Sequence, residues 1–291
     1  MDYLLTHTFA IKMKDLNMTS IKTYAYATAL LSSVYMISSE TNAAVDYTNL
    51  NFNNWIDEGA ATVAFSGYTY EKVSTMKFTN VATVNGVAID ATITASAMSG
   101  SGAGAWGGFR GNYAVGSDAP RGDIAFHYYG AKAGPTFVNL NLKFFVGGTS
   151  FTQSKSLDSF RLMMYDVDGE AAQDEFATAY MADGLYGFQR GTLMTATQNS
   201  DNVRFKGPGA NQSETDTAGA FLLYYANTSS VNILMESMLD SGTNNPVFSA
   251  LDGDQSMTMT GTFTSVALVP APGAAALLGL AGVICGRRRR N

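Results

Sequence analysis

Cysteine and histidine are scarce in this 291-residue chain, and their scarcity excludes several kinds of chemistry. The single cysteine, Cys285, lies near the C-terminus, so the remainder of the chain forms no intramolecular disulfide. With His127 as their one histidine, residues 46–268 hold no histidine-cysteine zinc site, no cysteine nucleophile and no two-histidine metal centre. A Ser-His-Asp triad would have to use His127, and the sequence lacks the Gly-x-Ser-x-Gly nucleophile motif.

Positive charge is also scarce in the central region. Residues 46–268 contain 21 Asp and Glu but 11 Lys and Arg, so their net charge is near -10. An acidic surface repels the phosphates of nucleic acids and anionic lipids, whereas it attracts cations. We therefore expect no nucleic-acid partner.

Long apolar runs are missing as well, and the two most apolar stretches lie at opposite ends of the chain. The first, Tyr24–Ile37, follows three lysines and precedes the small, polar residues 38–44. A basic segment, a short apolar run and a small-residue exit predict a secretory signal peptide over residues 1–44, cut by signal peptidase after Ala43 or Ala44. The alternative is a buried core helix, since the run is too short to span a bilayer core of about 30 Å.

The C-terminal end, residues 269–291, has three parts in a fixed order. The first part is the motif Val269, Pro270, Ala271, Pro272 and Gly273. A weakly apolar run, Ala274–Cys285, comes next. The third part is the cluster Arg287, Arg288, Arg289 and Arg290. The prolines favour an extended segment, and the arginines are expected to stay cytoplasmic by the positive-inside rule.

This ordered triplet resembles the PEP-CTERM sorting signal of Gram-negative bacteria, with Ala271 where that family has glutamate. The resemblance covers the tail alone. It implies transient insertion in the inner membrane as a short hydrophobic helix, followed by cleavage near the proline motif by an exosortase. The alternative is a plain C-terminal membrane anchor.

Between the two ends, apolar and polar residues alternate with a period of two. This pattern predicts half-buried strands at Val87–Thr94, Thr136–Val146, Phe160–Val167, Ala220–Ala226, Val231–Glu236 and Met257–Thr264. Turn-rich spacers at Gly100–Gly111, Gly147–Ser150, Lys206–Ser213 and Ser241–Pro246 separate the strands. One segment, Glu170–Tyr180, has the composition of a short helix. We therefore predict an all-β domain over residues 45–268, an antiparallel β-sandwich of the jelly-roll type.

The glycine-rich spacer Gly100–Gly111 contains a Gly-x-Gly-x-x-Gly pattern at residues 102–107. No helical pattern follows it, although dinucleotide binding requires a helix there. We expect a flexible loop here. Its aromatic residues, Trp106 and Phe109, are candidate contacts for the face of a sugar. The alternative is that both rings fold back onto the core.

Three carboxylates surround a glycine turn in the segment Asp166-Val167-Asp168-Gly169-Glu170. Calcium takes six to eight oxygen ligands, and closely spaced acids in a turn provide them. Asp166, Asp168 and Glu170 are therefore the candidate ligands of a structural calcium ion, and Asp174 and Glu175 are candidates for further ligands. The alternative is an ordinary solvated β-turn.

Taken together, these features favour a non-enzymatic, exported protein of the cell surface or extracellular matrix, with signal peptidase and an exosortase as processing partners. Extracellular polysaccharide is the candidate ligand. Two alternatives stay open: a carbohydrate-binding module, and a glycan hydrolase that uses two carboxylates. The spacing of the acids singles out no catalytic pair.

Overall fold

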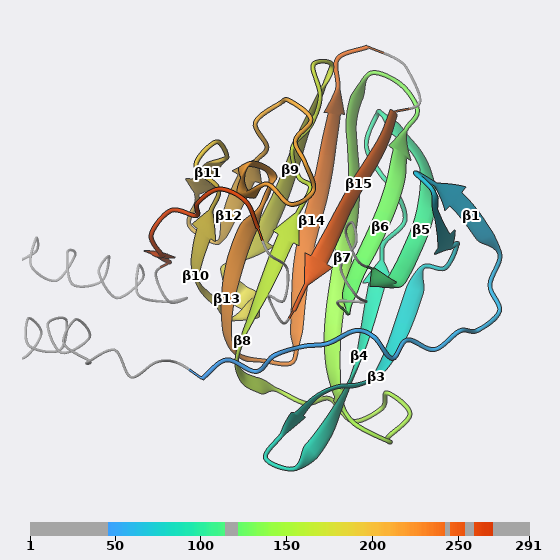
Figure 1. Cartoon of the computed structure of the whole chain (residues 1–291), viewed down its shortest axis with the longest axis vertical. Coiled ribbons are helices and arrows are strands. Elements are labelled where there is room, and N and C mark those ends of the chain that lie inside the picture. The colour runs from blue at the N-terminus through green and yellow to red at the C-terminus, as the bar shows by residue number, and fades with distance from the viewer. Residues whose placement is uncertain (1–45, 114–121, 242–244, 254–258, 270–291) are drawn as a thin grey trace, which may run out of the picture. The chain divides into compact units, whose positions relative to one another are not determined.

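The computed structural model describes residues 46–113, 122–241, 245–253 and 259–269. The expected signal peptide and the tail from Pro270 onward lie outside these ranges. Val269, the first residue of the sorting motif, is described; it is buried and donates its backbone N–H to the carbonyl of Tyr186. The described part is all β, as the alternation predicts (Figure 1).

Helix is confined, in the described ranges, to two short 3-10 turns, η1 (Met181–Asp183) and η2 (Thr217–Gly219). No helix there has the length and apolar character needed to cross a membrane.

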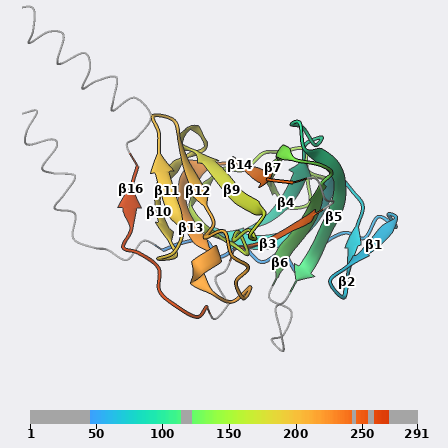
Figure 2. The same ribbon diagram turned by 90° about the horizontal axis from the view of Figure 1, so that it is seen from above.

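Nine of the described strands form one antiparallel sheet. In spatial order they are β1 (Thr62–Phe65), β2 (Tyr68–Glu71), β5 (Ala103–Tyr113), β6 (Asp123–Gly130), β15 (Asn245–Asp252), β8 (Leu157–Tyr165), β13 (Phe221–Thr228), β10 (Leu185–Arg190) and β16 (Ala267–Leu268). Figure 2 shows the β1–β2 hairpin and β16 at opposite ends of the domain.

The other seven described strands form the second antiparallel sheet. Its order is β11 (Thr195–Gln198), β12 (Asn202–Lys206), β9 (Gln173–Tyr180), β14 (Ser230–Leu239), β7 (Gly134–Val146), β4 (Val87–Ala95) and β3 (Thr75–Val84). Four of the strands predicted from alternation correspond to β4, β7, β8 and β13, and a fifth lies within β14.

The strand pairing is that of a jelly roll. The pairs β6–β15 and β8–β13 lie in the first sheet, whereas β7–β14 and β9–β12 lie in the second. Each pair is nested inside the previous one along the chain, and successive pairs alternate between sheets. This arrangement is what results when one long antiparallel ribbon wraps around a core. The predicted sandwich is therefore confirmed, together with its jelly-roll connectivity.

The main core lies between the two sheets, and period-two alternation explains its composition. In β6, for example, Phe126 and Tyr128 belong to this core, whereas Ala125 faces the other side of the sheet. A second apolar cluster, including Tyr70 and Tyr113, covers that outer side of the nine-stranded sheet. The first sheet is therefore buried on both faces over part of its area.

The prediction of a flexible loop at Gly100–Gly111 is wrong, because most of this segment is strand β5. Glycine is disfavoured in strands on its own, but here other parts of the fold fill the space that side chains would need. A Cβ atom at Gly107 would collide with the imidazole of His127, and one at Gly111 would meet the ring of Trp55 at 2.7 Å. The glycines let large rings from elsewhere in the chain lie flat against the strand.

Two further sequence predictions are also wrong. The proposed helix at Glu170–Tyr180 is largely strand β9, which pairs with β12 on one side and β14 on the other. Tertiary pairing on both edges outweighs the local helix preference of its Ala and Glu residues. In the proposed strand Met257–Thr264, the described residues 259–264 form isolated bridges to Asp216 and Gly191 and no regular strand.

Candidate ligand cleft

A cleft of about 500 Å³ opens on the outer side of the nine-stranded sheet. Its walls come from the β1–β2 hairpin, the end of β5, the β8–β9 connection, residues 211–214 and the start of β15. Its volume is in the range that proteins use for small organic ligands. The cleft therefore joins segments that are distant in the sequence at one place on the surface.

One wall of the cleft is aromatic. Phe65 and Tyr68 flank the two-residue turn of the β1–β2 hairpin, where Ser66 and Gly67 have positive φ angles of 49° and 81°. Phe65 and Tyr68 are directly paired across this tight turn, so their side chains lie on the same face of the hairpin. Phe248 of β15 lies nearly parallel to Phe65, with ring centroids 6.4 Å apart. All three rings are half-buried, so part of each faces the cleft.

The opposite wall is acidic. Among the described lining residues are five carboxylates and no lysine or arginine: Asp166, Asp168, Glu170, Glu175 and Glu214. Asp166 follows the last residue of β8 in a left-handed conformation, with φ 59°, and Gly169 turns the chain again with φ 78°. The backbone N–H of Gln212 donates to Asp168 Oδ2, which ties the 211–214 segment to this turn.

Burial and like charge perturb these acids. Burial, with a smaller contribution from the charges of Asp168 and Glu214, raises the pKa of Asp166 to about 8. Burial likewise raises the pKa of Asp168 to about 6, against the opposing effect of the backbone N–H donors around it. Burial also raises the pKa of Glu175 well above its usual value, and Asp168 and Asp166 add to the effect. Perturbed carboxyl groups gathered in one cleft are a marker of a functional site.

Glu214 is held by a tyrosine of strand β5. The hydroxyl of Tyr113, at the end of β5, donates to Glu214 Oε2 at 2.9 Å. Burial raises the pKa of Glu214, whereas this hydrogen bond lowers it. Tyr113 itself is fully buried, so the contact fixes the position of the carboxylate.

His127 lies behind the aromatic wall and not in the cleft. Its ring stacks on Phe65 at a centroid distance of 4.6 Å and meets Tyr70 edge-on at 4.4 Å. The side chain is fully buried, and neither ring nitrogen has a hydrogen-bond partner among the described residues. Burial lowers the pKa of His127 to about 4, so the ring is neutral at pH 7. It acts as part of the packing, with no described nucleophile or acid beside it.

The three candidate calcium ligands do come together here, since Asp166, Asp168 and Glu170 all line the cleft. Within the described ranges, however, no three His, Cys, Asp or Glu side chains are arranged to hold one metal ion. The calcium site therefore stays a prediction. Glu175, one of the two further ligands that the sequence offered, also lines the cleft, whereas sequence reasoning missed Glu214 because no local motif marks it.

The prediction that Trp106 and Phe109 form an exposed platform for a sugar is wrong for Phe109. Phe109 is fully buried in the main core. Trp106 packs edge-on against it at 4.8 Å, and its indole Nε1–H donates to the carbonyl of Val73 at 2.7 Å. The alternative reading, in which both rings fold onto the core, is the one observed. The half-buried aromatic residues at the candidate site are Phe65, Tyr68 and Phe248 instead.

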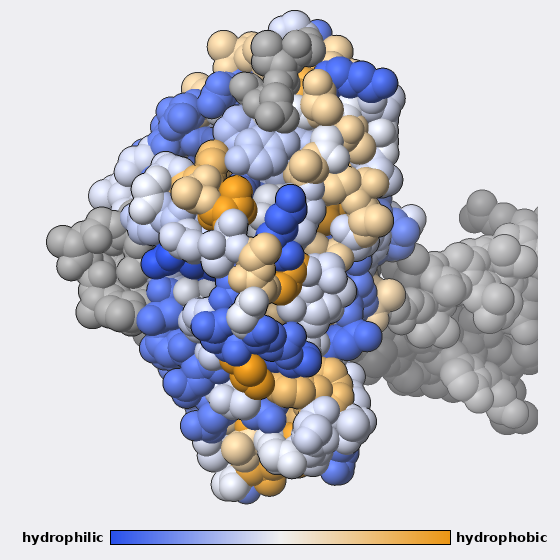
Figure 3. Space-filling model, turned by 90° about the vertical axis from the view of Figure 1, so that its right-hand side faces the viewer, coloured by the Kyte–Doolittle hydropathy of each residue, from blue (hydrophilic) through white to orange (hydrophobic). Residues whose placement is uncertain are grey.

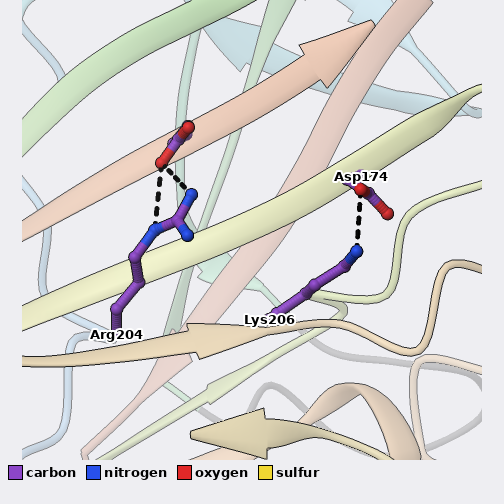
Figure 4. A network of polar contacts seen from close by, with 4 residues as sticks. Asp174, Arg204 and Lys206 are labelled. Carbon is purple, nitrogen blue, oxygen red and sulfur yellow. Dashed lines mark hydrogen bonds and ion pairs between the residues drawn. The ribbon is translucent and has the colours of Figure 1, made fainter. Parts of the chain in front are cut away.

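The wet face of the seven-stranded sheet carries paired charges. Arg204 of β12 contacts Glu236 of β14 at 2.7 Å, and Lys206 contacts Asp174 of β9 at 2.8 Å (Figure 4). The guanidinium of Arg204 also lies 3.7 Å from the centroid of the Phe176 ring. Lys206 and Asp174 lie on neighbouring strands, whereas Arg204 reaches Glu236 across the intervening strand β9. Partly exposed ion pairs of this kind contribute at most about 1 kcal/mol each to folding stability. We therefore assign these charges to the structure of the sheet and not to a binding site.

Exposed apolar side chains are few in the described part of the chain. The large ones are Ile56, Val87, Leu193, Val266 and Leu268. On the face shown in Figure 3, hydrophobic residues are scattered in small groups among hydrophilic ones. Single exposed apolar residues are ordinary on protein surfaces. The acidic cleft is therefore the feature that stands out.

No family model matches this chain, and no curated protein matches its sequence. Among solved structures, it is similar to the N-terminal domain of the Streptococcus gordonii adhesin Sgo0707, with 14% identity and a TM-score of 0.45 over 71% of this chain and 62% of that one. It is also similar to the adhesin domain of PrgB from Enterococcus faecalis. For the form bound to DNA, the identity is 15% and the TM-score 0.38, over 65% of this chain and 68% of that one. For another structure of the same adhesin domain, the identity is 14% and the TM-score 0.37, over 67% of this chain and 66% of that one. Likenesses of this size fix neither an activity nor a partner.

Proposed function

We propose that this chain is an exported protein of the bacterial cell surface or matrix, and that its jelly-roll domain binds an extracellular ligand in the acidic cleft. The observation that carries the proposal is the cleft itself, with half-buried aromatic rings on one side and carboxylates on the other. Aromatic faces with a few convergent polar groups are typical of sites for polysaccharide and other small polar ligands.

The binding proposal has a direct test. The purified full chain is titrated with extracellular polysaccharide from its native host, and binding is measured by calorimetry. We expect binding that is weakened at least tenfold in Tyr68→Ala, because this half-buried ring lines the cleft. Equal binding by the variant Leu193→Ala, which changes an exposed residue outside the cleft, is the matched control. Unchanged binding in Tyr68→Ala would show that the ligand does not bind in this cleft.

The export route forms a separate part of the proposal. The order of proline motif, apolar run and arginine cluster supports cleavage by an exosortase near Pro272. The apolar run of 274–285 would span only about 18 Å as a helix, short of a membrane core of about 30 Å, so it makes a poor permanent anchor. Intact mass measurement of protein recovered from its host decides the matter. A mass lacking both ends supports cleavage, whereas a mass that keeps the four arginines indicates a plain anchor.

A glycan hydrolase is the second candidate, and one observation favours it. The cleft contains carboxyl groups whose pKa values are raised to different extents, about 8 for Asp166 and about 6 for Asp168. Two acids whose pKa values differ in this way can serve as proton donor and proton acceptor. Incubation with polysaccharides would then release new reducing ends, and Asp166→Asn would abolish the release. Binding without any release supports the non-enzymatic proposal.

An acidic domain also makes nucleic acid an unfavourable partner. Residues 46–268 carry nearly twice as many acids as bases, so DNA should bind weakly if at all. A gel-shift titration with double-stranded DNA at 50 mM salt tests this expectation. A shift of the DNA band at micromolar protein would contradict the prediction of weak DNA binding.

A further inference from the structure

Two deeply buried polar groups line the acidic cleft with hydrogen-bonding capacity to spare. Glu175 is 5% exposed; its Oε1 accepts from Gln173 Nε2 at 2.8 Å, and the backbone N–H of Asp168 lies near the carboxyl group, but Oε2 has no partner with full hydrogen-bond geometry in the described part of the chain. Tyr70 is fully buried, and its hydroxyl is likewise without a partner there. Leaving such buried groups without a partner is unfavourable, and more so for a charged group. A ligand that donates hydrogen bonds would recover this free energy.

The charge of the cleft indicates which donor it takes. The charges of Asp168 and Glu214 raise the pKa of Asp166, and those of Asp168 and Asp166 raise the pKa of Glu175. No lysine or arginine is among the described lining residues. Arg110 contacts the aromatic wall but does not line the cleft: its guanidinium is 5.2 Å from the Tyr68 ring centroid and donates to the carbonyl of Thr69. Burial keeps Asp166 largely protonated at pH 7 without a ligand, and a cationic ligand would favour the charged form of the acids and offset their mutual repulsion. An ammonium group provides both a positive charge and three donors.

The dimensions and walls of the cleft favour an organic cation over a metal ion. No three acids within the described ranges converge as ligands of one ion. A volume of about 500 Å³ is far larger than one ion needs, and it suits a small organic ligand. The half-buried rings of Phe65 and Phe248 face this space, and aromatic faces attract ammonium groups and the C–H faces of sugar rings.

The rim of the cleft matches the remaining chemistry of a sugar. Asn211, Gln212 and Ser213 line it with amide and hydroxyl groups that can pair with sugar hydroxyls. The segment is held in place, because the Gln212 N–H donates to Asp168 and the Gln212 side chain donates to the carbonyl of Ala210. Carboxylates on one wall, aromatic rings on the other and amides beside them fit an amino sugar.

We infer that the cleft binds a glycan containing amino sugars with free ammonium groups, that is, a de-N-acetylated hexosamine polymer. The inference rests on the proposed function, because it names the ligand class for the same cleft. The ammonium lies against the acidic group that includes Glu175 and Glu214, and the sugar ring lies against the aromatic wall that includes Phe65 and Phe248. N-acetylation removes the positive charge and two of the donors, so it should abolish this recognition.

The test is calorimetric titration of the purified full chain with two matched probes, a glucosamine tetramer and an N-acetylglucosamine tetramer. We expect the glucosamine tetramer to bind at least tenfold more tightly. Glu175→Gln and Glu214→Gln should each weaken that binding at least tenfold. Asp158→Asn, which removes an exposed carboxylate of β8 outside the cleft, should leave it unchanged. If Glu175→Gln proves unfolded by circular dichroism, Phe248→Ala on the opposite wall takes its place.

Several results would overturn the inference. Equal affinity for the two tetramers would show that the ammonium is not recognised. Equal affinity for tetralysine would show that a peptide, not an amino sugar, is the ligand. Calcium chloride binding that is lost in Asp168→Asn, with no binding of the glucosamine tetramer, would assign the acids to a metal ion. If the glucosamine tetramer does not bind but another host polysaccharide does, and Tyr68→Ala weakens that binding, the inference fails and the proposed function stands. If no polysaccharide binds, the proposed function fails as well.

Discussion

The hydroxyl of Tyr113 donates to Glu214 Oε2 at 2.9 Å and joins two residues that are 101 positions apart in the sequence. The tyrosine ends β5 at the sheet, and the glutamate belongs to the segment that closes the cleft between β12 and β13. One hydrogen bond thus connects the rigid sheet to a wall of the candidate site. Predictions about stability and about the cleft follow from this contact and from its neighbours.

Tyr113→Phe should loosen the acidic wall. The variant loses a hydrogen bond to a carboxylate, which lowers the free energy of unfolding by about 1–2 kcal/mol. The pKa of Glu214 should rise further, because the hydroxyl now lowers it. Urea unfolding measures the first effect, and carbon-detected NMR titration of the carboxyl measures the second. Tyr180→Phe, at the far end of β9 from Glu175, is the control; equal changes in both variants would contradict the role of the contact.

Asp166 should make the protein less stable as the pH rises. Its pKa is about 8 in the folded chain and 3.8 in the unfolded chain, so the folded state holds the proton more tightly between these values. Stability from this group is complete below pH 4 and is lost as the pH rises through 8, by at most about 1.4 kcal/mol per pH unit. Asp166→Asn should therefore unfold with a shallower loss of stability from pH 5 to pH 8. A loss as steep as in the unchanged chain would contradict the raised pKa, and Asp158→Asn is the control.

His127 should have the opposite dependence on pH. Its pKa is about 4 when folded and 6.5 when unfolded, so protons bind the unfolded chain preferentially in this range. The contribution of His127 to stability is present above pH 6.5 and is lost as the pH falls towards 4. In His127→Phe, which keeps a ring against Phe65, stability relative to the unchanged chain should increase as the pH is lowered from 7 to 4. Guanidinium unfolding at pH 7, 5.5 and 4 tests this trend, and a difference that stays constant with pH would contradict it.

The core contact between Phe205 and Phe221 should be one of the costliest to remove. Their rings stack at 4.1 Å with an angle of 3°, and they join β12 of one sheet to β13 of the other. Both side chains are fully buried, so Phe205→Ala leaves a cavity and should lower the free energy of unfolding by about 3–5 kcal/mol. Leu193→Ala, at a side chain that is 61% exposed, should change it by less than about 0.5 kcal/mol. Similar midpoints for the two variants in urea unfolding would argue against the stacked core contact.

The sequence by itself determined the fold class and part of the site. Alternation with a period of two is a local property, and it identified β4, β7, β8 and β13 because each has one face in the core. The turn after β8 was also visible, since Asp166, Asp168 and Gly169 are neighbours in the chain. Scarcity of histidine and cysteine removed whole classes of catalytic site without any structure.

The tertiary structure alone decided the glycine-rich strand, the strand nature of β9 and the complete cleft. Gly107 lies in a strand because His127 of β6 fills the space beside it, and no local signal reports a neighbour 20 residues away. β9 is a strand because β12 and β14 pair with both of its edges. Glu175 and Glu214 reach the turn at Asp166 only through the register of those strands and the connections between sheets. Periodicity tells which residues share a face, but which faces meet depends on contacts between distant segments.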